Sequence, residues 1–156
     1  MPNITTNLWF DTQAEEAAQY YCRIFPNSKI NNISHYPDGT PRAGSVLTVD
    51  FELDGTRFTA LNGGPEFRFT EAVSFLIDCQ DQAEVDHYWD ALTADGGEES
   101  QCGWLKDRFG VSWQVVPRQL PELLSNPDQA LVGRVTQAMF QMAKIDVAEL
   151  ERAAAQ

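Results

Sequence analysis

The chain contains two copies of one short sequence pattern, and this duplication limits the folds open to it. Residues 6–17 (TNLWFDTQAEEA) and 74–85 (SFLIDCQDQAEV) each pass from a short apolar run through a polar break into a segment rich in Glu, Gln and Ala. Residues 56–61 (TRFTAL) and 111–116 (VSWQVV) form a second pair, and each copy follows a glycine. The offsets are 74 − 6 = 68 and 111 − 56 = 55, so the copies differ by a loop-sized deletion. Such internal similarity indicates two units of one architecture in tandem.

The first copy predicts a strand, a helix and three further strands. Apolar and small residues from Ala14 to Phe25 recur at the spacing of one helix face, and Pro26 marks the end of that helix. Alternating apolar residues predict strands, and Asp54 with Gly55 predicts a tight hairpin between the last two. The predicted elements are the strand 4–10, the helix 14–25 and the strands 29–36, 47–53 and 56–61.

The second copy and the tail complete an α+β chain of tandem βαβββ modules. The second module contains the strand 72–78, a helix that stops at Gly96-Gly97, and the strands 99–102, 104–108 and 111–116. In the helical tail we expect Asn126 as an N-cap before Pro127, and Asp146 with Glu149 as a capping box. We thus expect one duplicated domain over 1–156, with modules at about 1–64 and 70–118 and C-terminal helices over about 119–156.

Charge and cysteine content restrict the partners and the compartment. The net charge of −12 repels phosphate backbones and anionic lipids, which argues against nucleic-acid and membrane partners. The N-terminal residues lack the basic and apolar regions of a signal peptide, and no apolar run approaches the ~20 residues that span a bilayer. Cys22, Cys79 and Cys102 are odd in number and show no C-x-x-C spacing, which argues against a disulfide framework and structural zinc. A cytoplasmic location is expected.

Four long segments and the trailing AMFQMAKID carry a resemblance to a known family. The segments are LWFDTQAEEAAQYY, FTALNGGPEFRFTEAVSFLIDC, AEVDHYWDAL and CGWLKDRFGVSWQVVP. Through them the chain resembles the PhnB-like branch of the vicinal oxygen chelate superfamily (glyoxalase, bleomycin resistance and dioxygenase proteins), a branch often labelled as a demethylubiquinone methyltransferase domain. The resemblance implies an open curved sheet of the glyoxalase type, helices on its convex side and a ligand cleft on its concave side.

The resemblance also implies where a metal would be held. In metal-using relatives the first and last strand of each unit supply one His, Glu or Gln ligand each, which places the four positions at Thr6, Ser74, Thr59 and Gln114. Only Gln114 has a side chain of that kind, and hydroxyl groups bring neither charge nor imidazole. A shift of one residue introduces Asn7 but no His or Glu. We therefore expect neither a typical metal site nor a cofactor.

Several side chains are candidates for lining the cleft. If Gln114 faces the cleft, strand alternation turns Trp113 towards the helix side as core, while Trp104 forms an apolar wall. Cys102, expected on a strand near the cleft, is a nucleophile, a substrate contact or a packing residue. No base accompanies it in the sequence, which favours packing. The predicted ligand-binding set is Thr6, Leu8, Thr59, Ser74, Cys102, Trp104 and Gln114.

The remaining charged and aromatic candidates each have two interpretations. Asp50 and Glu52 share one strand face, either as an acid–base pair in the cleft or, as we favour, as a solvated face. His35 and His87 are expected in a loop and on the helix surface, which argues against a His triad and leaves His35 as a minor acid–base candidate. Phe67 and Phe69 are left open as a cover for the cleft, a plug or a dimer contact. Lys106-Asp107 are expected to make surface or turn contacts rather than to act in catalysis.

Three functions remain open at this point. The first is metal-independent binding of a small molecule in the cleft; the second is an atypical metal-dependent lyase, isomerase or dioxygenase; the third is a methyltransferase, as relatives are labelled. Residues 62–65 (NGGP) predict a bend, and no glycine-rich strand-to-helix turn typical of a Rossmann-type methyltransferase occurs in the sequence. A homodimer is expected, because the resemblance implies paired modules and the apolar C-terminal helix needs a covering surface.

Overall fold

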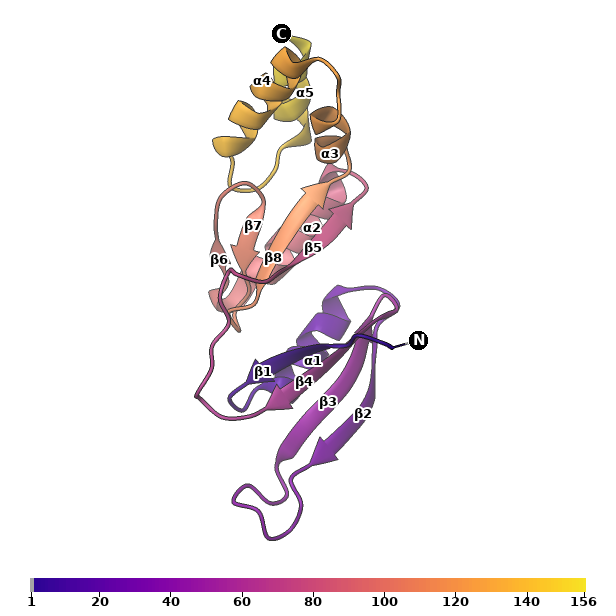
Figure 1. Ribbon diagram of the computed structural model, residues 1–156, viewed down its shortest axis with the longest axis vertical. Coiled ribbons are helices and arrows are strands. Elements are labelled where there is room, and N and C mark those ends of the chain that lie inside the picture. Colours follow the sequence, from indigo (N-terminus) through magenta and orange to yellow (C-terminus); the bar gives the residue numbers. More distant parts are fainter. Residues whose placement is uncertain (1) are drawn as a thin grey trace. The chain divides into compact units, whose positions relative to one another are not determined.

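The computed structural model describes residues 2–156, which form two compact units, one ending at Arg68 and the other comprising Phe69–Gln156. In the first unit, β1 pairs in parallel with β4, and β3 pairs antiparallel with both β4 and β2, in the order β1-β4-β3-β2 (Figure 1). The elements of this unit are β1 (Thr6–Phe10), α1 (Ala14–Ile24), β2 (Lys29–His35), β3 (Val46–Leu53) and β4 (Thr56–Asn62).

Helix α1 covers one face of the first sheet and leaves the other face open. Ala14, Ala17 and Ala18 are fully buried, and such small side chains let the helix lie close to the strands. From the sheet, Val49 and Phe51 are buried in the same core, whereas their strand neighbours are only half-buried. This alternation along β3 confirms that the predicted period of two marks a sheet with one covered face.

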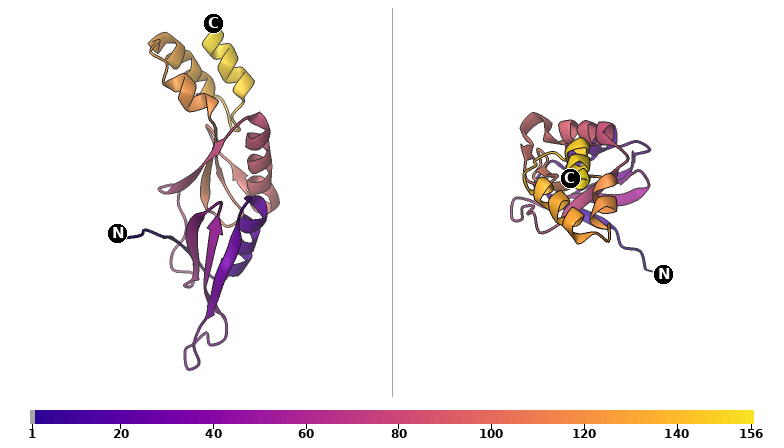
Figure 2. Two further views of the ribbon diagram at one scale, coloured as in Figure 1. Left: turned by 90° about the vertical axis from the view of Figure 1, so that its right-hand side faces the viewer. Right: turned by 90° about the horizontal axis from the view of Figure 1, so that it is seen from above.

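The second unit repeats the arrangement and adds helices. Its sheet has the order β5-β8-β7-β6, with β5 parallel to β8, and α2 packs against it as α1 does in the first unit (Figures 1 and 2). Its elements are β5 (Ser74–Cys79), α2 (Gln82–Thr93), a short 3-10 turn (Ala94–Gly96), β6 (Glu98–Glu99), β7 (Trp104–Lys106), β8 (Ser112–Pro117), α3 (Gln119–Leu124), α4 (Gln129–Phe140) and α5 (Val147–Ala155). The predicted α+β fold of two βαβββ modules with C-terminal helices is confirmed.

The predicted strand 99–102 is wrong beyond Glu99. Strand β6 ends there, and the chain then turns with a positive φ of 58° at Cys102 and 86° at Gly103. The N–H groups of these two residues donate to the carbonyl oxygens of Met142 and Ala143, each at 2.8 Å. The backbone that would have extended the strand therefore binds the tail instead, a long-range partner that local alternation does not reveal.

The helix starts in the tail were predicted in part. Helix α4 begins two residues later than expected, because Asp128 rather than Asn126 is its N-cap and accepts from the N–H groups of Ala130 and Leu131. Asn126 instead accepts from the N–H of Asp128. The cap at Asp146 is confirmed, since its carboxylate accepts from the N–H of Glu149 at 3.2 Å.

The three C-terminal helices share a small core of their own with the end of β8. Leu120, Val135, Ile145 and Leu150 are buried together, and Val116 packs against them. Helices α4 and α5 lie side by side (Figure 2). The apolar face of α4 is thus covered within its own unit, and the expected homodimer stays a prediction that rests on the resemblance. Across residues 2–156, every helix is too short or too polar to traverse a lipid bilayer.

Candidate functional site

The open face of the second sheet brings three predicted site residues together. Gln114 on β8 lies opposite Leu76 on β5 and opposite Trp104 on β7. Its Nε2 donates a hydrogen bond of 2.9 Å to Oγ of Ser74. This bond orients the amide, while its Oε1 has no partner within residues 2–156. The result is an oriented amide between two apolar side chains, of which Leu76 is 51% exposed and Trp104 half-buried.

The opposite face of the same sheet is core. Trp113 and Val115, which alternate with Gln114 along β8, are 4% and 0% exposed. The indole Nε1 of Trp113 donates to Oδ2 of Asp107 at 2.9 Å. The prediction that Trp113 faces the helix side is therefore confirmed, and Asp107 belongs to the core rather than to surface contacts, as its 2% exposure shows.

In the first unit the structure places the predicted β1 residues on the covered face. Thr59 on β4 lies opposite Asn7, not Thr6, whereas Gln114 lies opposite Leu76. Between equivalent residues of the two units, the offset is 114 − 59 = 55 for the last strands, as the sequence comparison indicated. For the first strands it is 76 − 7 = 69, one residue more than the 68 of the sequence comparison. A slip of one residue moves a side chain to the other face of a sheet. Leu8 accordingly lies in the core at 5% exposure.

Thr59 belongs to a polar row on the open face of the first sheet. Its hydroxyl donates to Oδ1 of Asp50 at 2.8 Å, and the two residues are direct cross-strand neighbours. Glu52 accepts from Nδ2 of Asn31 at 3.1 Å and lies 3.9 Å from Nζ of Lys29. Asp50 and Glu52 thus have separate partners, an arrangement typical of a solvated polar face rather than an acid–base pair.

Cys102 occupies the turn before β7, not a strand as predicted. Its backbone is held in the left-handed region by the hydrogen bond from its N–H to Met142. Non-glycine residues adopt this region only where surrounding contacts support it. The backbone of Cys102 therefore anchors the tail, and the place of its side chain in the ligand-binding set stays a prediction.

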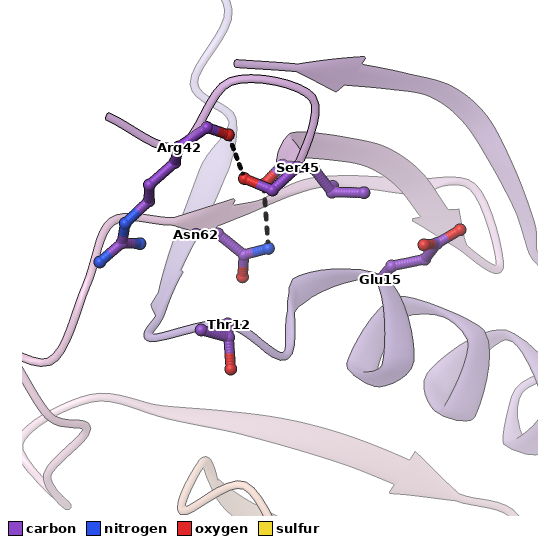
Figure 3. A pocket seen from close by; sticks show the side chains of 6 residues that line it. Thr12, Glu15, Arg42, Ser45 and Asn62 are labelled. Carbon is purple, nitrogen blue, oxygen red and sulfur yellow. Dashed lines mark hydrogen bonds between the residues drawn. The ribbon is translucent and has the colours of Figure 1, made fainter. Parts of the chain in front are cut away.

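Asn62, which the sequence indicated only as part of a bend, is one of the residues that line a pocket of about 200 Å³ in the first unit (Figure 3). Asn62 is 6% exposed, and its Oδ1 accepts from the N–H of Ala14 at 2.8 Å while its Nδ2 donates to the carbonyl of Val46 at 3.1 Å. The side chain thus joins the start of α1 to the start of β3. Its position directly after an alternating strand was the only sequence signal, and both of its bonds serve the fold.

The residues at the superfamily metal positions do not fit a metal ion. In the observed register these positions hold Asn7, Thr59, Leu76 and Gln114, which provide no charge and no imidazole. Nowhere in residues 2–156 do three His, Cys, Asp or Glu side chains come close enough together to hold a metal. Both histidines, His35 and His87, are exposed.

Cys79, at the end of β5, is expected to be unreactive in the folded protein. Burial, with the charges of Glu84 and Asp78, raises the pKa of its thiol from 9.0 to about 12. At about pH 8 this leaves roughly 1,000-fold less thiolate than an ordinary cysteine has. Iodoacetamide should therefore modify Cys79 in urea but not in buffer, as measured by mass spectrometry, and equal modification in both would contradict the prediction.

The raised pKa of Cys79 also predicts how stability depends on pH. Between pH 9 and 12 the unfolded chain loses a proton from this thiol that the folded chain keeps, so the free energy of unfolding should fall as the pH rises.

Comparisons with known proteins agree with this fold. A family model described as 3-demethylubiquinone-9 3-methyltransferase matches residues 2–116. The structure of a PhnB protein from Bacillus cereus is 32% identical with a TM-score of 0.68, covering 74% of this chain and 99% of that one. Protein PA1353 from Pseudomonas aeruginosa is 18% identical with a TM-score of 0.63, covering 75% of this chain and 98% of the other.

A more distant structure is similar in fold alone. FosX from Listeria monocytogenes, a fosfomycin resistance protein solved with Mn(II) and sulfate, is 16% identical with a TM-score of 0.55 and covers 79% of this chain and 94% of its own. A search of curated proteins finds no match. Helices α3 to α5 lie beyond the residues that the family model matches. The chain belongs to the PhnB-like 3-demethylubiquinone-9 3-methyltransferase family.

Proposed function

We propose that the protein binds a small organic molecule on the open face of the second sheet, without a metal of the superfamily type. The observation that carries the proposal is the Gln114 amide, held by Ser74 between Leu76 and Trp104. Small-molecule sites typically combine apolar walls with a few oriented polar groups. The ligand would place an apolar or aromatic part against Leu76 and Trp104 and a hydrogen-bond donor near Oε1 of Gln114.

The two other functions have less support in the residues. A metal-dependent lyase, isomerase or dioxygenase would need charged or imidazole ligands at positions that hold Asn7, Thr59, Leu76 and Gln114. A methyltransferase is what the family description names. The connections before α1 and α2, residues 11–13 and 80–81, contain no glycine to bring a cofactor close to the backbone.

A thermal-shift screen of small organic compounds, followed by titration of the hits, tests the proposed site. Gln114→Ala should weaken binding of a hit about tenfold, because it removes the oriented hydrogen bond and part of the contact surface. Trp104→Phe should abolish most of the ligand-induced change in tryptophan fluorescence. Gln137→Ala, on the exposed side of α4, is the matched control and should bind as the unaltered protein does.

Other results of the same experiment would favour the alternatives. Hits that bind Gln114→Ala and the unaltered protein equally would contradict the proposed site. Stoichiometric Fe, Mn, Ni or Zn in the purified protein would favour metal chemistry. A rise in melting temperature with S-adenosylmethionine would favour methyl transfer, since a ligand that binds only the folded state stabilises it.

A further inference from the structure

A pocket of about 140 Å³ lies at the β6 edge of the second sheet and shares one wall with the proposed ligand face. Trp104 is that shared wall, because it lines the pocket and also flanks Gln114. The polar residues that line the pocket are Glu71, Glu98, Glu99, Ser100, Lys106 and Ser112. All of them belong to the second unit, so the pocket is complete within it.

Negative charge predominates in this pocket. Three carboxylates line it with a single ammonium, that of Lys106, which forms an ion pair with Glu71. Glu98 lies directly across the β6–β7 pair from Lys106, and Glu99 accepts a hydrogen bond of 2.6 Å from Nε1 of Trp89. The hydrogen bond that the Lys106 ammonium donates to Glu71, together with the charges of Glu71 and Glu98, raises the pKa of Lys106. With Glu99 bonded to Trp89 on the covered side of the sheet, Glu71 and Glu98 face the single cation Lys106, so the pocket carries net negative charge and favours a positively charged guest.

Ser112 provides a second and independent indication of a ligand. Its residue exposure is 1%, and its Oγ has no hydrogen-bond partner within residues 2–156, although it lines the pocket. Buried hydroxyl groups are nearly always hydrogen-bonded, so an orphan one calls for a missing partner. An N–H group of a ligand in the pocket would be such a partner.

We propose that this pocket binds an N–H-bearing cation, an ammonium or guanidinium group, of a ligand whose apolar part lies on the open sheet face. The carboxylate of Glu98, on the same strand face as Lys106, supplies the opposite charge, the indole of Trp104 supplies an aromatic face, and Ser112 accepts an N–H. The volume suits a small group rather than a whole ligand, since a liquid water occupies about 30 Å³. This inference rests on the proposed function and adds the ligand's class, an organic cation that carries N–H donors.

Three matched probes separate charge, N–H donation and apolar contact. Benzylammonium carries charge and N–H donors, benzyltrimethylammonium carries charge alone, and benzyl alcohol is neutral. Each is titrated into the protein while the Trp104 indole signal is followed by NMR. Benzylammonium is expected to bind at least tenfold more tightly than benzyl alcohol and several-fold more tightly than benzyltrimethylammonium.

Variants then assign the effect to the pocket. Glu98→Gln should weaken benzylammonium binding about fivefold or more and leave benzyl alcohol unchanged, whereas Glu151→Gln, an exposed residue of α5, should change neither. Ser112→Ala should weaken benzylammonium binding without lowering the melting temperature, because the hydroxyl it removes has no partner in the protein. A purely structural Ser112 would lower the melting temperature and leave binding intact.

Different experimental results would overturn the cation pocket and the proposed ligand face. Equal affinity for benzylammonium and benzyl alcohol, with both weakened by Gln114→Ala, would overturn the cation pocket and keep the ligand face. Weakening by Glu98→Gln alone, with no effect of Gln114→Ala on any hit, would keep the pocket and overturn the face. Absence of benzylammonium binding at millimolar concentration would overturn the inference, and the compound screen would then decide the function by itself.

Discussion

Replacing Asp107 with alanine is expected to lower the free energy of unfolding of the second unit by about 4 kcal/mol, because a buried carboxylate accepts three hydrogen bonds there. Its Oδ1 accepts from the N–H groups of Phe109 and Val111 at 2.9 and 3.1 Å, and its Oδ2 accepts from Nε1 of Trp113 at 2.9 Å. Hydrogen bonds to a charged group contribute roughly 1.5–3 kcal/mol each, and the variant leaves buried donors without a partner. The turn between β7 and β8 depends on these bonds.

Urea unfolding followed by tryptophan fluorescence measures this loss. Asp107→Asn is the matched variant of equal size, and we expect an intermediate loss of about 2 kcal/mol, because one amide oxygen remains while the NH₂ group meets a donor. Asp90→Ala, at an exposed position of α2, should change stability by no more than about 0.5 kcal/mol. A loss below about 1 kcal/mol for Asp107→Ala would show that the turn is held by other contacts.

Ile145→Ala is expected to cost about 3 kcal/mol and to loosen the C-terminal helices. Ile145 lies in the connection between α4 and α5, is fully buried and packs with Leu120, Val135 and Leu150. Its side chain also lies close to Gly103, where an added Cβ would meet it at 3.0 Å. The change leaves a cavity where the tail meets the turn of Cys102 and Gly103, whose N–H groups donate to Met142 and Ala143. The variant thus tests whether helices outside the family match are an integral part of this unit.

Hydrogen exchange and urea unfolding together check this result. In Ile145→Ala the amides of α4 and α5 should exchange faster, and the exchange of β8 should rise less. Ile145→Val should cost only about 1 kcal/mol, and Phe140→Ala, whose side chain is 58% exposed, should cost less still. If Ile145→Ala and Phe140→Ala cost the same, the tail would pack on the sheet only weakly.

The candidate site was predictable for the second unit and less so for the first. Ser74, Trp104 and Gln114 do share the open face of the second sheet. In the first unit Asn7, not Thr6, is the neighbour of Thr59. The apolar pattern of β1 does not show which of its residues face the open side of the sheet. That depends on which residue of β1 pairs with which residue of β4. That pairing is made 52 residues apart, as 59 − 7 shows, so no local pattern contains it.

By itself, the sequence determined the order of the elements, the duplication and the covered faces of the clearly alternating strands, because hydrophobic periodicity and turn chemistry are local properties. Only the tertiary structure decided the register of β1, the turn at Cys102, the core role of Asn62 and Asp107, and the pocket around Ser112. Each of these depends on hydrogen bonds or packing between groups that the fold brings together. The duplicated pattern thus specified two similar sheets. The non-local contacts of Gln114 with Ser74, Leu76 and Trp104 made the open face of the second sheet the better candidate for binding.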